Sequence, residues 1–190
     1  MCSMQGRRPG RRETRPILLW ALGGAGVMIV AGSALHFAFG WAGGWRPLAL
    51  VAAVNESIWE HLKLAFWPGL AWAMLTRPGA GLPRGERLAA AGIGLSAVSA
   101  LIVAVFTGYT EILGTNLLAL DIGTFVLAVL AGQGVVAALL RAGPMGRGLV
   151  AAGLALLLAQ VLAFSLFTFH PPAHWLFVEA GSGLSGLPPG

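Results

Sequence analysis

Charged side chains are scarce in this chain, because Asp, Glu, Lys and Arg make up only 10% of its 190 residues. Soluble globular domains use about 25% charged residues to cover their surface with polar groups. Hydrophobic residues account for 57% of the chain, and the mean hydropathy is +0.79. These values exclude a soluble domain and indicate an integral membrane protein whose main partner is the lipid bilayer.

Cysteine is nearly missing, since the only one is Cys2. No intramolecular disulfide can form, and cysteine usage says nothing about the compartment. The chain also has no phosphate loop, CxxC or HExxH motif. Its isoelectric point near 11.1 would suggest nucleic acid in a soluble protein. Here the arginines fall between apolar stretches, where they determine membrane orientation, so we expect no nucleic-acid partner.

Five apolar stretches are long enough to cross a hydrocarbon core, which takes about 20 residues. They cover residues 17–39, 57–76, 87–107, 116–140 and 147–169. Each must be a helix, because every backbone amide in lipid needs a partner within the protein. The segment 46–54 is too short to cross and is predicted to be interfacial or re-entrant. The predicted fold is an all-α, polytopic membrane helix bundle of about five transmembrane helices.

The basic residues predict how this bundle is oriented. Ten of the twelve Lys and Arg residues fall in the N-terminal tail and in the loops after the second and fourth spans. By the positive-inside rule that side is cytoplasmic, so a multi-pass protein of the cell membrane with its C-terminus outside is expected. The domains are then a basic cytoplasmic tail (1–16), a transmembrane domain (17–177) and a flexible extracytoplasmic tail (178–190).

Ionisable residues gather in the outer half of this topology, above all in the stretch NESIWEHLKL at 55–64. An ionisable side chain inside a span costs several kcal/mol and usually faces a bundle interior or a water-filled cavity. We therefore predict a polar pocket that opens to the outside. His36, His61 and Asp121 are expected at similar depth, and two imidazoles with a carboxylate suit a divalent metal such as zinc. A hydrogen-bonded network of the same groups also fits the pattern.

The start of the second span has two interpretations. Glu56, Glu60 and Lys63 have helical spacing i, i+4 and i+7, which predicts one charge-paired stripe beside His61. In a metal-dependent enzyme Glu60 would act as the base and Lys63, the only lysine, as an electrostatic stabiliser. Alternatively, Ser57 and Glu60 form a capping box that serves only to start the helix.

Several motifs resemble a domain-of-unknown-function family of small prokaryotic integral membrane proteins. They are LHF at 35–37, NESIWEHLKL followed by FWP, YTxILG at 109–114 and LDI at 120–122. The resemblance covers nearly the whole chain after residue 17 and brings no established activity. The resemblance implies that certain positions are shared with the family, and we take candidate binding residues from these positions. Ser57 of the capping box is added to them. These are Asn55, Glu56, Ser57, Trp59 and Tyr109.

Two histidine spacings are similar to those of membrane zinc hydrolases of the alkaline ceramidase and adiponectin-receptor type. They are Ser57-x-x-x-His61 and His170-x-x-x-His174, although Pro171-Pro172 keeps the second pair out of a helix and five spans replace seven. Three function classes stay open: a metal-dependent hydrolase acting at the outer leaflet, a small-ion or proton binding or transport protein, and a non-catalytic membrane subunit. The sequence identifies no protein partner and leaves open whether the chain forms a homo-oligomer.

Overall fold

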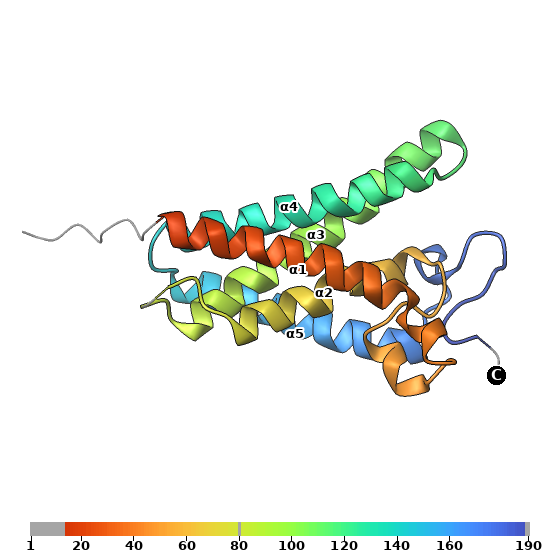
Figure 1. Cartoon of the computed structure of the whole chain (residues 1–190), viewed down its shortest axis with the longest axis horizontal. Coiled ribbons are helices and arrows are strands. Elements are labelled where there is room, and N and C mark those ends of the chain that lie inside the picture. The colour runs from red at the N-terminus through yellow and green to blue at the C-terminus, as the bar shows by residue number, and fades with distance from the viewer. Residues whose placement is uncertain (1–13, 80, 189–190) are drawn as a thin grey trace, which may run out of the picture.

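The computed structural model describes residues 14–79 and 81–188, and these residues form a bundle of helices (Figure 1). The elements in chain order are α1 (Thr14–Trp41), η1 (Arg46–Leu50), α2 (Ile58–Leu75), α3 (Arg84–Leu113), α4 (Leu118–Arg141), α5 (Arg147–Phe169) and η2 (Trp175–Phe177). The two η elements are short 3-10 helices. The predicted all-α fold is confirmed, and each predicted span coincides with one α-helix to within a few residues.

Four of the five α-helices, α1, α3, α4 and α5, are long and apolar enough to cross a membrane. The remaining helix, α2, has 18 residues, which correspond to about 27 Å. It carries Glu60 and Lys63, yet nine of its residues are buried. The other helices therefore shelter α2, and this shelter lets a charged pair exist inside an apolar bundle.

Helices that follow one another in the sequence run in opposite directions along the bundle, whereas α3 and α5, which are in contact, run parallel. At one end the indole nitrogen of Trp20 on α1 donates to Thr76 just after α2, and at the other end His36 contacts His61. The loop segments 76–79, 81–83 and 142–146 lie at the same end as the start of α1 (Figure 1). The predicted basic end thus exists as a structural feature, although the arginines within residues 1–13 lie outside the described residues. Its direction across a membrane stays a prediction.

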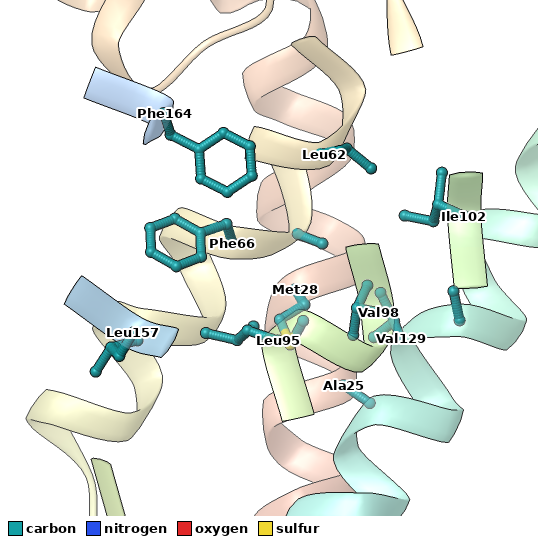
Figure 2. Packing of buried hydrophobic residues seen from close by; sticks show 12 residues of the cluster. Ala25, Met28, Leu62, Phe66, Leu95, Val98, Ile102, Val129, Leu157 and Phe164 are labelled. Carbon is teal, nitrogen blue, oxygen red and sulfur yellow. The ribbon is translucent and has the colours of Figure 1, made fainter. Parts of the chain in front are cut away.

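The helices approach closely where glycines face each other. Gly92 of α3 lies against Gly153 of α5, and Gly94 of α3 lies against Gly132 of α4. A side chain at any of these four positions would collide with backbone or side-chain atoms of the facing helix. Small residues at helix contacts are how membrane helices maximise packing without a hydrophobic driving force. Between these contacts the core contains larger side chains such as Met28, Phe66 and Val129 (Figure 2).

The segment after η2, for which the sequence predicts a flexible tail, folds back onto the bundle. Val178 and Ser185 form an isolated antiparallel bridge. The side-chain amide of Asn55 donates to the carbonyl oxygen of Gly186 over 2.8 Å, and Leu187 packs against a small apolar cluster that includes Phe39. The C-terminal segment therefore contacts the loop that precedes α2, while its mobility stays a prediction.

Candidate metal centre

The start of α2 is defined by its capping residues. The hydroxyl oxygen of Ser57 accepts the amide of Glu60 over 3.4 Å, and the Ser57 amide donates to the side chain of Asn55 over 2.9 Å. Ser57 is thus the N-cap predicted from the capping box, and the helix begins at Ile58. Glu56 consequently lies before the helix, in the loop, where its side chain is free to turn toward α1.

Two histidines and Glu56 meet between α1 and the start of α2. The Nε2 atoms of His36 and His61 are 3.3 Å apart. Oε2 of Glu56 lies 3.5 Å from Nε2 of His36 and 3.3 Å from Nε2 of His61. Among the described residues, His36, Glu56 and His61 are the group of three His, Cys, Asp or Glu side chains that lie close enough together to hold one metal ion.

These separations match a tetrahedral zinc site. Zinc binds histidine nitrogen and carboxylate oxygen at about 2.0 to 2.1 Å, which places two ligands of a tetrahedron about 3.3 Å apart. The orientation of His61 fits as well, because its Nδ1 lies 2.8 Å from the carbonyl oxygen of Ser57. A carbonyl only accepts, so we assign a proton to Nδ1, which leaves Nε2 as the ring atom that faces Glu56 and His36 and that could bind a metal on losing its own proton. Such a backbone partner is typical of metal-bound histidine.

The three side chains differ in exposure. The side chain of Glu56 is 58% exposed, whereas those of His36 and His61 are 28% and 32% exposed. The pKa of Glu56 lies below its usual value, chiefly because of its hydrogen bond with His61, and the charges of the two imidazoles add to this effect. The carboxylate is therefore ionised at neutral pH, as a metal ligand must be.

The group lies in the wall of a cavity of about 790 Å³, a size typical of small-ligand sites. The cavity lies among α1, α2, α3 and α4, and Ala180 of the C-terminal segment also lines it. The ionisable groups in its wall are His36, Glu56, His61 and Asp121. Apolar side chains such as Ile29 and Ile102 line its other parts. A ligand on the metal would thus enter a partly open cavity that is polar in one part and apolar in another.

Asp121 lines this cavity, but it is not part of the three-residue group. Its carboxylate accepts hydrogen bonds from the hydroxyl of Tyr109 and, over 3.1 Å, from the amide of Asn116. The structure therefore brings the predicted ligands His36 and His61 together and places Glu56, rather than Asp121, beside them. Tyr109, a candidate binding residue, contacts Asp121 at the end of α3.

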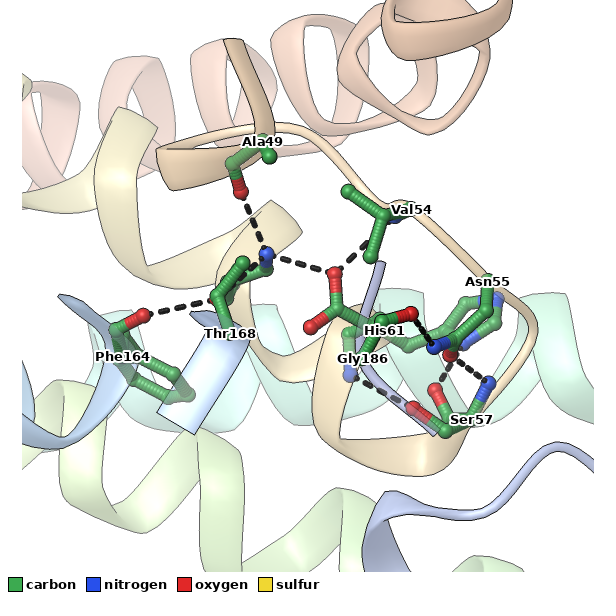
Figure 3. Close-up of polar contacts among 10 residues, drawn as sticks. Ala49, Val54, Asn55, Ser57, His61, Phe164, Thr168 and Gly186 are labelled. Carbon is green, nitrogen blue, oxygen red and sulfur yellow. Dashed lines mark hydrogen bonds and ion pairs between the residues drawn. The ribbon is translucent and has the colours of Figure 1, made fainter. Parts of the chain in front are cut away.

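Glu60 and Lys63 form a separate, buried ion pair with 2.6 Å between Nζ and Oε2. Glu60 also accepts the amide of Val54 over 3.0 Å. Lys63, which is fully buried, donates to the carbonyl of Ala49 over 2.8 Å and to the hydroxyl of Thr168 over 2.9 Å (Figure 3). The pair joins α2 to η1 and α5. The predicted stripe of Glu56, Glu60 and Lys63 does not form. Glu56 precedes α2, and its carboxylate contacts His36 and His61 instead.

The remaining candidate residues have structural contacts. The indole of Trp59 packs against Phe164 and Phe177. Asn55 joins the N-cap to Gly186, as described above. His174 accepts the amide of Leu176 through Nδ1, and neither His174 nor His170 belongs to the three-residue group.

Sequence reasoning missed the position of Glu56 and the partners of Lys63. For Glu56 the signal was present, since a capping box that starts at Ser57 excludes residue 56 from the helical stripe. For Lys63 one partner is a backbone carbonyl of Ala49, which no side-chain pattern reveals. The other, Thr168, lies more than 100 residues away in the sequence.

Comparison with known proteins gives one match. A model of a family described as "Family of unknown function (DUF6512)" matches residues 11–187. Neither the curated proteins nor the solved structures give a significant match. The match covers the bundle, both halves of the candidate metal centre and the C-terminal segment, but it assigns no activity to them.

Proposed function

Because the chain belongs to DUF6512, a family of unknown function, we propose its function from the geometry of the site. The protein is an integral membrane metalloprotein that binds one divalent ion of the zinc type through His36, Glu56 and His61. The spacing of the three ligand atoms carries this proposal, since all three separations fall at 3.3 to 3.5 Å. Such a set is expected for ligands around one ion.

Three protein ligands leave the fourth position of a tetrahedral ion open. Structural zinc sites are usually closed by four protein ligands, whereas catalytic sites keep one position for water. All three side chains line the cavity, so a substrate in the cavity could reach an ion that they would hold. A zinc-bound water loses a proton near pH 7 and becomes a nucleophile. We therefore favour a metal-dependent hydrolase that acts on a carbonyl compound in the outer half of the bundle.

The reaction is a hydrolysis of an ester or amide and needs no redox partner. An ion held by His36, Glu56 and His61 would activate a water, whose oxygen would form a bond to the carbonyl carbon while the bond from that carbon to the leaving oxygen or nitrogen breaks. One proton of the water ends on the leaving alcohol or amine, and the other goes to solvent as the carboxylate product forms. The ion polarises the carbonyl, and Glu56 offsets part of its charge.

The first test is the zinc content of the purified protein. After loading with zinc and removal of excess ion, the wild-type protein should hold about one zinc per chain. His36→Ala and His61→Ala should lose it, and Glu56→Gln should weaken binding by tenfold or more, because a neutral amide is a poor zinc ligand. His170→Ala is the matched control, since this exposed histidine lies outside the group and should leave zinc binding unchanged.

Cobalt(II) substitution gives a second readout, because its visible absorption reports coordination geometry. We expect the spectrum of a four-coordinate ion that changes when a small anion occupies the open position. If the wild-type protein holds no more zinc than the His61→Ala variant, the metal centre does not exist. The same three groups would then form a hydrogen-bonded proton or ion site, or a structural contact in a non-catalytic membrane subunit. Zinc binding without hydrolysis of any acyl ester or amide would leave the metal centre and refute the enzyme.

A further inference from the structure

The distribution of charge in the cavity says which head group a substrate would carry. The ionisable groups in the wall are the three metal ligands and Asp121, and no lysine or arginine lines the cavity within the described part of the chain. A site for a phosphate or carboxylate head group normally supplies Arg or Lys, and the start of α4, which borders the cavity, already has Asp121 in its first turn. Away from the metal, this cavity offers the carboxylate of Asp121 instead.

Asp121 is held in a defined position for such a role. Its two oxygens accept hydrogen bonds from Tyr109 and from Asn116, so both donors fix the carboxylate without neutralising its charge. Carboxylate oxygens have about four acceptor sites, and two of them remain for a ligand. A protonated amine or a hydroxyl is the partner that these sites can bind. A second anion would instead meet a carboxylate that has no lysine or arginine beside it in the cavity wall.

The apolar part of the cavity extends from the metal centre along α1. Ile29, Gly32 and His36 are spaced i, i+3 and i+7, so they lie on one face of that helix and span about 10 Å. Ile102 of α3 and Phe125 of α4 line the cavity as well and belong to, or pack against, the buried core. An acyl or alkyl chain fits this apolar wall.

We propose that the substrate is a single-chain amphiphile with a neutral or cationic head, held with its head on Asp121 and its apolar chain against Ile29, Ile102 and Phe125. This inference rests on the proposed hydrolase, in which the carbonyl between chain and head lies at the metal. An amine-bearing or hydroxyl-bearing ester or amide has the required groups in this order. Anionic amphiphiles, phospholipids with a net negative head included, are excluded at the Asp121 end.

The test measures binding without turnover, using ether-linked probes that a hydrolase cannot cleave. The probes are 2-dodecyloxyethylamine, 2-dodecyloxyethanol and dodecyloxyacetic acid, which share one chain and differ in head group. Zinc-loaded protein in lipid nanodiscs is compared with Asp121→Asn and with the control Glu111→Gln, which removes an exposed carboxylate outside the cavity wall. Native mass spectrometry reports the bound fraction of each probe and the zinc content in one experiment.

Asp121→Asn should weaken binding of the amine by about fivefold or more, corresponding to the loss of one ion pair, and should not weaken binding of the acid. Glu111→Gln should change neither. An amine probe with a diazirine on the last carbon of its chain should label peptides that contain Ile29, Ile102 or Phe125. Labelling confined to exposed residues such as Leu127 or Leu158 would refute the proposed position of the alkyl chain in the cavity.

The two proposals fail in different ways. Equal effects of Asp121→Asn on the amine and the acid, with zinc retained, would refute the head-group assignment and leave the metal centre intact. Binding in the expected order by a protein that holds no zinc would refute the hydrolase and leave the amphiphile site. Chain labelling in the wild-type protein does not depend on any substitution, so a variant that fails to fold cannot hide the result.

Discussion

At the residue scale, the buried pair of Glu60 and Lys63 should be much more sensitive to the loss of one partner than an exposed pair. Removing one partner leaves the other charge in an apolar interior, which costs about 3 to 5 kcal/mol. We therefore expect Lys63→Met and Glu60→Gln each to lower the free energy of unfolding strongly. The double substitution removes both charges and should be milder than Lys63→Met alone. Denaturant unfolding in detergent micelles measures all three, with exposed Glu111→Gln as the control.

If each single substitution is no more destabilising than the double one, the pair does not have this structural role. The same samples test the catalytic interpretation of Glu60 and Lys63. Both side chains are almost fully buried and are occupied by partners on three neighbouring segments. We expect the double variant, where it remains folded, to keep its zinc, since neither residue belongs to the ligand group.

The residues also show what a sequence can reveal about a site. The sequence predicted that His36 and His61 lie close together, because both fall near the outer end of adjacent spans. For the third member it predicted Asp121, whereas the structure has Glu56 in this place. That choice depends on the path of residues 51–57, which the Glu60 contact with Val54 and the Asn55 contact with Gly186 determine. The first contact joins the loop before α2 to the helix, and the second joins residues 131 positions apart, so no helical periodicity encodes either.

At the scale of elements, the helix bounds were predictable because hydropathy and length constrain a membrane helix strongly. The close contact between α2 and α1 was harder to predict from hydropathy. Its proline at position 68 cannot donate to the carbonyl of Leu64. A side chain at Gly32 of α1 would come within 2.7 Å of that same carbonyl oxygen, so the two helices are in close contact there. This approach places the α1 residues around His36 beside the start of α2.

The contact of α3 with α5 leads to a prediction about Gly153. A β-carbon at this position would overlap backbone atoms of Ala89, which cannot move away by changing rotamer. Gly153→Ala should therefore destabilise the protein by about 1 to 3 kcal/mol. Gly148→Ala, in the same helix, has no atom within 4 Å of its new β-carbon and should be neutral or slightly stabilising. Thermal unfolding of both variants decides the matter, and equal melting temperatures would show that α3 and α5 are not in close contact.

At the scale of the whole molecule, the two ends of the bundle have different chemistry. One end has Arg77, Arg84, Arg141 and Arg147 in or beside its loops, whereas the other has the candidate metal centre and the C-terminal segment. Arg87 at the basic end is buried and donates to the carbonyl of Ala73 over 3.1 Å, so this end also has a packing role for arginine. The arginine-rich loops and the cavity therefore lie at opposite ends of the bundle.

This asymmetry predicts the direction of the protein in a membrane. By the positive-inside rule the arginine-rich end is cytoplasmic, which places the C-terminus and the candidate metal centre outside. Fusions of alkaline phosphatase, which is active only outside the cytoplasm, should be active after residue 188 and inactive in the loop 142–146. Fusions of a cytoplasmic fluorescent protein at the same two sites should give the opposite pattern. Activity of the phosphatase in the arginine-rich loop would reverse the orientation, and the hydrolase would then meet substrates from the cytoplasmic leaflet instead of the outer one.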